Sequence, residues 1–162
     1  MKKIVSFVMT FILSLLVVTI CGCDFVGNNS NIPENSKFGT APEITAAAQM
    51  GESVIGYPTL EIVVTNNSDK DIAAIRFYII NYDVYGKEIN NFLTDSILDT
   101  DTKIVSGDTE DFLWQFLEQD VKMVKLFVYS VYYTDGSEWG DKDAIKSEIL
   151  KNAPTINVSP ID

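Results

Sequence analysis

Residues 60–82 read LEIVVTNNSDKDIAAIRFYIINY, and this stretch decides the fold. Two runs rich in β-branched and aromatic residues flank an Asn-Asn-Ser-Asp segment. β-branched and aromatic side chains favour strands, and Asn, Ser and Asp favour turns because their side chains hydrogen-bond to the nearby backbone. The stretch therefore predicts two strands, 59–66 and 72–82, joined by a short polar connection.

Short apolar runs separated by turn residues continue along the rest of the chain. Asp135-Gly136 precedes Ser137-Glu138-Trp139, which is a strong hairpin signal. The run 112–117 is too continuously apolar to assign from its period, so a helix from there to about Val121 is an open alternative. Several short strands at regular spacing predict an all-β, immunoglobulin-like antiparallel sandwich. The predicted strands are 43–49, 59–66, 72–82, 97–105, 108–116 and 122–134, with a weaker one near 87–92.

One short helix is expected near the C-terminus, over residues 143–151. Asp143 can cap its first turn, and Ile145 and Ile149 lie one helical turn apart. Asn152-Ala153-Pro154 then ends the pattern.

Three local features resemble a known family. They are the Asn-rich turn after a strand, the Tyr-Asp-x-x-Gly turn at 82–86, and the Tyr-Thr-Asp-Gly hairpin at 133–136 with Trp139 after it. Together they are similar to immunoglobulin-like domains of bacterial lipoproteins and secreted proteins, which include the FxLYD-type and related domains of unknown function. The resemblance covers about residues 43–140 and implies the fold. It brings no catalytic residues with it.

The N-terminus has the pattern of a secretory signal. Residues 1–23 read MKKIVSFVMTFILSLLVVTICGC, with two lysines followed by an uncharged apolar run. Its last four residues, Ile20-Cys21-Gly22-Cys23, resemble the lipobox of bacterial lipoproteins. That resemblance implies cleavage after residue 22 and a diacylglyceryl group on Cys23, which would hold the protein on the extracytoplasmic face of the cell membrane. An uncleaved membrane-spanning helix is the alternative.

The domain organisation follows from composition. Residues 1–22 are the predicted signal peptide, and residues 23–42 are the lipidated N-terminus and a tether rich in Asn, Ser, Gly and Pro, which we expect to be flexible. Residues 43–162 form the one predicted domain. Cys21 would leave with the signal and Cys23 would be lipidated, so neither a disulfide within the domain nor thiol catalysis is expected.

The charge balance excludes several classes of function. The chain has 12 Lys plus Arg, 23 Asp plus Glu and no His, for a formal charge of −11. Such an acidic surface repels nucleic acid, and histidine-based catalysis or metal binding is excluded. Asp99, Asp101 and Glu110 have the spacing of EF-hand ligands, but Lys103 and Ile104 stand where a ligand and the turn glycine are needed. No metal and no cofactor are predicted.

The clearest candidate binding surface is aromatic. If strands 72–82 and 122–134 are neighbours, alternation places Tyr78, Tyr82, Phe127, Tyr129 and Tyr133 on one outward face. An exposed face of this kind would suit a protein, peptide or glycan partner. We favour the alternative that the C-terminal segment covers it, through Ile145, Ile149, Leu150 and Ile156. Trp114 and Trp139 are interpreted as packing residues.

These observations predict a membrane-anchored binding or scaffold module without enzymatic activity, whose partner is an envelope protein or glycan. One alternative is a small hydrolase of envelope glycans that uses paired carboxylates, with Asp99, Asp101, Asp135 and Asp141 as candidates. The other is an accessory solute-binding lipoprotein, although one domain of this size lacks two lobes that could close around a solute.

Overall fold

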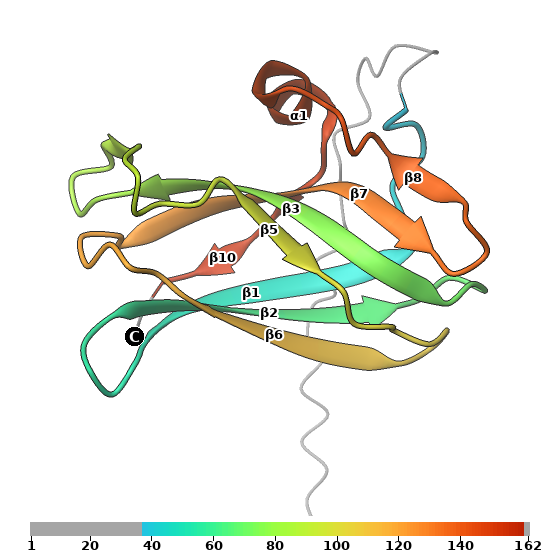
Figure 1. Cartoon of the computed structure of the whole chain (residues 1–162), viewed down its shortest axis with the longest axis horizontal. Helices are drawn as coiled ribbons and strands as arrows, with labels where there is room; N and C mark the ends of the chain where they lie inside the picture. The colour runs from blue at the N-terminus through green and yellow to red at the C-terminus, as the bar shows by residue number, and fades with distance from the viewer. Residues whose placement is uncertain (1–36, 161–162) are drawn as a thin grey trace, which may run out of the picture.

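Two β-sheets pack face to face in the computed structural model, which describes residues 37–160 (Figure 1). The first sheet has the strand order β10-β1-β2-β6, and the second has the order β4-β3-β7-β8, with β5 paired to β3 and β9 paired to β7. The strands are β1 (Ile44–Glu52), β2 (Pro58–Asn66), β3 (Ile72–Tyr82), β4 (Glu88–Ile89), β5 (Ile97–Thr100), β6 (Thr109–Gln115), β7 (Met123–Tyr133), β8 (Glu138–Gly140), β9 (Thr155–Ile156) and β10 (Val158–Ser159), and the helix is α1 (Lys146–Asn152).

The topology confirms the predicted all-β sandwich. Neighbours β1-β2-β6 on one sheet and β5-β3-β7-β8 on the other follow the strand orders of immunoglobulin-like domains. The chain crosses between the sheets after β2, after β5 and after β6, as a Greek-key arrangement requires, and once more after β9. β3 and β7 form the central antiparallel pair of the second sheet, from Ile72 opposite Tyr133 to Tyr82 opposite Met123.

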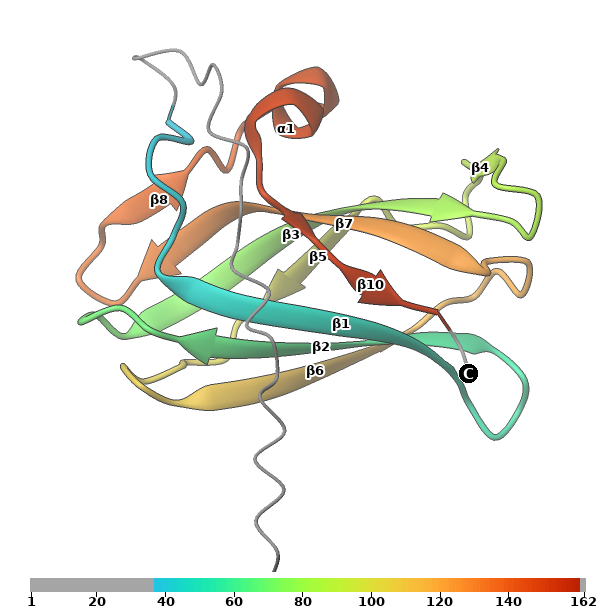
Figure 2. The ribbon, with the colours of Figure 1, turned by 180° about the vertical axis from the view of Figure 1, so that it is seen from behind.

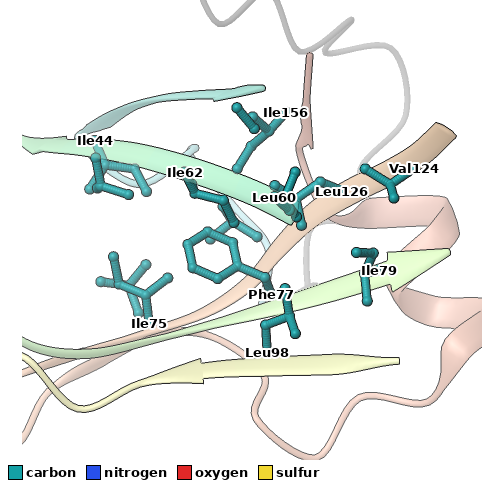
Figure 3. Close-up of a cluster of buried hydrophobic side chains, with 14 of the residues drawn as sticks. Ile44, Leu60, Ile62, Ile75, Phe77, Ile79, Leu98, Val124, Leu126 and Ile156 are labelled. Atoms are coloured by element: carbon teal, nitrogen blue, oxygen red, sulfur yellow. The ribbon is translucent and has the colours of Figure 1, made fainter. Parts of the chain in front are cut away.

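The core between the sheets is built by alternation along the strands. Ile75, Phe77 and Ile79 of β3 point inward, and Leu60 and Ile62 of β2 meet them from the other sheet (Figure 3). All five are at most 1% exposed. Burying such side chains supplies the main driving force for folding, at about 25 cal/mol per Å² of apolar surface.

The ambiguous run 112–117 is a strand, not a helix, as far as Gln115. Phe112 and Trp114 turn toward the core and Leu113 turns outward, because β6 pairs with β2 throughout and must alternate with it. The predicted strand 97–105 is too long. β5 ends at Thr100, and Ile104 contributes one bridge to Ile72.

The last strand of the second sheet is interrupted. β8 pairs with β7 at residues 130–132 and β9 pairs with β7 at residues 126–127, so residues 141–154 form an insertion between two pieces that lie on the same edge. Gly140, the last residue of β8, immediately precedes the insertion and has φ +83°, and a Cβ there would overlap the carbonyl oxygen of Tyr129. After β9 the chain crosses to the first sheet, where β10 runs parallel to β1 (Figure 2).

The insertion contains the short helix that the sequence predicted. α1 starts at Lys146 after Ile145, so Asp143 is not its N-cap. Instead, the carboxylate of Glu148 accepts a hydrogen bond from the Ile145 backbone N–H at 3.3 Å. Within residues 37–160 no helix has the length and apolar character needed to cross a membrane. The predicted signal peptide and Cys23 lie outside these residues.

Candidate interaction surface

The predicted aromatic face exists, and the insertion covers it. Tyr78, Phe127 and Tyr129 form a second cluster on the outer side of the β3–β7 sheet, together with Ile80. Ile149 of α1 packs onto them and is 2% exposed. Figure 1 shows α1 standing over this side of the sheet. The covered alternative that we favoured from the sequence is therefore confirmed.

The cover uses fewer of the predicted residues than expected. Ile145 and Leu150 are exposed, and Ile156 packs into the core between the sheets. Phe38 takes part instead, with its ring buried in the second cluster and edge-on to Trp139 at 5.9 Å between ring centroids. Phe38 falls within residues 23–42, which we expected to be a tether. The packed domain therefore includes Phe38, which precedes the predicted domain start at residue 43.

Polar contacts hold the insertion at its margins. The Arg76 guanidinium pairs with Asp99 at 3.1 Å and donates a hydrogen bond to the Lys142 carbonyl at 3.4 Å. Lys146 of α1 pairs with Glu88 at 2.8 Å. Burial beneath this cover raises the pKa of the Tyr129 phenol. The tyrosines of this face therefore lie under the protein's own chain, and any partner that touched them would have to displace the insertion.

Tyr133 does not lie on the outward face on which the sequence placed it. Arg76 pairs with Ser130 and Phe77 pairs with Val128, so Tyr129 is an extra residue in a β-bulge. The bulge changes the phase of the alternation, and Tyr133 points into the core. Tyr82 does lie on the outer side, half-buried, with the Lys125 ammonium 5.6 Å from its ring centroid.

The candidate hydrolytic carboxylates are mostly engaged in ion pairs. Asp99 pairs with Arg76, Asp141 pairs with Lys37 at 3.0 Å, and Asp135 pairs with Lys70 at 2.8 Å. Hydrogen bonds from Lys70, and from the side chain and backbone N–H of Ser137, lower the pKa of Asp135. Asp101 is exposed. Among residues 37–160 no group of three carboxylates or cysteines is placed to bind a metal ion.

The sandwich has two very different ends. We call the end formed by the turns at 67–71, 101–108 and 134–137 the polar end. Its turns are tied together by side chains: Asn66 donates to the carbonyls of Lys70 and Ile104, and Asp71 pairs with Lys103 at 2.7 Å. Val105 is the one large apolar side chain exposed in these turns.

The opposite end is formed by the turns at 53–57, 83–87, 90–96 and 116–122, and we call it the apolar end. More than half of the large apolar side chains exposed by the described residues lie in these turns or at Met123, the first residue of β7. Tyr85 and Phe92 are 92% and 95% exposed, and Val54 is fully exposed. The full set is Val54, Ile55, Val84, Tyr85, Phe92, Leu93, Leu117 and Met123. Exposed apolar groups gathered in one region are typical of binding surfaces.

The turns of the apolar end are fixed by hydrogen bonds at their bases. The Asp83 carboxylate accepts from the backbone N–H groups of Tyr85 and Lys87, both at 2.9 Å. Ser53 accepts from the Tyr57 N–H at 3.1 Å. These hydrogen bonds thus hold the turns in place while tips such as Val54 and Phe92 stay exposed. Preorganised side chains lose less entropy when they bind a partner.

Contacts between the turns show that they are neighbours. Asn91 donates a hydrogen bond to Glu118 at 2.9 Å, which joins the 90–96 and 116–122 turns. The Phe116 N–H donates to the Pro58 carbonyl at 2.9 Å, which places residues 116–117 beside the 53–57 turn. Figure 1 shows these turns together at the left, with the described N-terminal residues at the right.

Sequence reasoning missed this surface, but the signal was present. Residues 53–56 read Ser-Val-Ile-Gly, a turn with two β-branched residues at its tip where polar residues are usual. Residues 83–86 read Asp-Val-Tyr-Gly with the same arrangement. Exposed apolar residues at the tip of a turn do not stabilise the fold, so they indicate a role in binding.

Comparisons with known proteins are sparse. No protein-family model and no curated protein matches the chain. A hypothetical protein from Peptoclostridium difficile 630 superposes with a TM-score of 0.46 at 12% identity, over 78% of this chain and 94% of its own. A DUF1425 family member from Shewanella sp. pv-4 gives 0.42 at 13% identity, over 52% of this chain and 75% of its own. Similarity at this level assigns neither a family nor an activity.

Proposed function

We propose that this protein is an extracytoplasmic lipoprotein, anchored through Cys23, whose domain binds an envelope partner through the apolar end. The observation that carries the proposal is that the four turns at one end of the sandwich expose apolar tips, such as Ile55 and Phe92. An exposed apolar surface of this extent lowers solubility and adds nothing to stability, so a partner that buries it is the simplest reason for its presence.

The direction of the chain supports this use of the surface. The described N-terminus runs beside β8, where the Lys37 carbonyl accepts from the Gly140 N–H and the Thr40 carbonyl accepts from the Trp139 indole. β1 then starts at the polar end, with Ile44 opposite Asn66. A membrane attachment that precedes residue 37 therefore joins the domain in its polar half, and the apolar end is the half away from the attachment.

The anchor is tested by replacing one sulfur. The Cys23→Ser variant should fail to incorporate a labelled fatty acid, and the native chain should incorporate it. Cys21→Ser is the matched control, because it removes the other cysteine of the same segment and should leave the labelling intact. Equal labelling of native chain and Cys23→Ser would exclude this anchor.

The binding surface is tested by photo-crosslinking in cells. A photo-crosslinking residue at Gln119 lies in the apolar end without replacing an apolar tip, and one at Thr134 lies in the polar end as the control. We expect a specific crosslinked product from Gln119, lost when Ile55→Ser and Phe92→Ser are combined, and none of comparable yield from Thr134. Equal yields from both positions, or no product from either, would contradict the proposed function.

A further inference from the structure

We infer that the partner of the apolar end is a protein surface on which apolar side chains are flanked by lysine or arginine. This inference rests on the proposed function and adds the chemical class of the partner. It follows from the charges in the turns that carry the apolar tips, from the hydrogen bonds at the bases of those turns, and from the acidic character of the whole chain.

The charges around the tips are mainly negative. Residues 52–57, 83–96 and 116–122 contain three times as many carboxylates as ammonium groups. Within these segments Lys87 and Lys122 are the cations, and both are exposed, while Lys146 of α1 pairs with Glu88 at 2.8 Å. Asp95 and Asp120 are exposed carboxylates, whereas Glu118 is half-buried and accepts the Asn91 hydrogen bond. The carboxylates are Glu52, Asp83, Glu88, Asp95, Glu118 and Asp120.

A basic protein surface complements this arrangement. Tyr85, Phe92 and Ile55 offer exposed apolar area that a partner would desolvate, and the exposed carboxylates of Asp95 and Asp120 can pair with cations of that partner. Such rim pairs add little affinity each, but they set orientation and exclude acidic competitors. Tyr and Phe are also the residues that most often anchor protein interfaces.

A lipid bilayer fits these charges less well. Segments that insert into membranes carry cations around their apolar side chains, because many lipid headgroups are anionic. Here carboxylates stand in those places, and the whole chain has a formal charge of −11. A second copy of this chain fits poorly as well, because two apolar ends in contact would bring their carboxylates together.

The test uses the full-length chain in membranes of the cells that produce it, with the photo-crosslinking residue at Gln119. The probes are three biotinylated synthetic peptides with identical leucine spacing and with lysine, serine or glutamate between the leucines. We expect the lysine peptide to give roughly five times the yield of the glutamate peptide, as two exposed ion pairs would produce. Added salt should reduce that ratio because exposed pairs are screened.

Two sets of variants separate charge from apolar contact. Asp95→Asn combined with Asp120→Asn should bring the lysine and glutamate yields together and leave the serine yield unchanged. Ile55→Ser combined with Phe92→Ser should lower the yields of all three peptides to that of the control position Thr134.

The outcomes distinguish this inference from the proposed function. Equal yields from the three peptides would overturn the inference while a Gln119 product in cells still supported a binding surface. A Gln119 product with the mass of a phospholipid adduct, or a crosslink to a second copy of the chain, would also overturn it. No product from Gln119 with any peptide or in cells would overturn both.

Discussion

The two ends of the sandwich differ in what the side chains of their turns contact. At the polar end, side chains of the turns bond to one another and to buried backbone groups, as Asn66 does with Lys70 and Ile104. At the apolar end, the side chains of Ser53 and Asp83 fix two of the turns at their bases, and the tip residues extend into solvent. The side chains of the polar end stabilise the fold, whereas the large side chains at the tips of the apolar end are exposed and contribute little to it.

This difference separates folding from function within one domain. Substitutions in the polar end should change the free energy of unfolding, because buried groups lose their partners. Substitutions at the tips of the apolar end should leave that free energy nearly unchanged and alter binding alone.

Asn66→Ala should have the largest effect. The side chain is fully buried, donates to two carbonyls, and its oxygen accepts from the N–H and hydroxyl of Ser68. Removing it leaves several buried groups unpaired, for a loss of about 3 kcal/mol or more. Urea unfolding followed by tryptophan fluorescence measures this. Asn67→Ala is the control, because Asn67 is exposed, and similar losses for both variants would contradict the role given to Asn66.

Ile149→Ala should destabilise the cover of the aromatic face. Ile149 is 2% exposed and is the buried residue of α1, so truncation should cost about 2 kcal/mol. We also expect faster amide hydrogen exchange in residues 146–152, because the helix loses its main contact with the sheet. Leu150→Ala, at the next and exposed position, should change little. Equal effects at the two positions would mean that α1 does not cover the face as described.

Asp135→Asn should change the acid side of the stability profile. Lys70 and Ser137 lower the pKa of Asp135 in the folded state below its ordinary value, which is about 3.9 in unfolded chains. The carboxylate therefore stabilises the fold above about pH 4, and this contribution is lost as the pH falls further. Comparing urea midpoints at pH 7 and pH 3 should give a smaller difference for Asp135→Asn than for the native chain. Asp120→Asn, at the apolar end, should leave the difference as it is.

Val54→Ser should have the smallest effect on stability, within about 0.5 kcal/mol, because an exposed apolar side chain contributes little to folding. Val54 is fully exposed, whereas Val64 of β2 is fully buried. Val64→Ser, the same chemical change, should therefore lower the free energy of unfolding by about 2 kcal/mol or more. A loss for Val54→Ser that approaches that for Val64→Ser would show that the tip packs against the fold.

The sequence predicted the sheet elements well because strand alternation and turn residues are local signals. The predicted strand 72–82 has the same first and last residues as β3, and the predicted hairpin at Asp135-Gly136 joins β7 to β8. The face of Tyr133 could not be predicted, because one extra residue at Tyr129 inverts every later position. Bulges depend on how two strands pair, and that pairing is not local.

The candidate surface was harder to predict than the fold. Aromatic residues at alternate positions drew attention to Tyr78 and Tyr129, and only the fold shows that Ile149 and Phe38 cover them. The tips at Val54 and Phe92 are far apart in the sequence, and the fold places their turns at the same end of the sandwich. Alternation along a strand is a local signal, so it does not indicate which distant turns share one end of the domain.

The central claim, that the apolar end is buried by a partner in the cell, is tested most directly by hydroxyl-radical footprinting of the native membranes. Oxidation of Tyr85 and Phe92 is compared with that of Tyr132, an aromatic residue that is 44% exposed near the polar end. We expect Tyr85 and Phe92 to be protected in the membranes relative to the purified full-length protein, and Tyr132 to be oxidised equally in both. Unchanged oxidation of all three, or protection of Tyr132 alone, would contradict this claim.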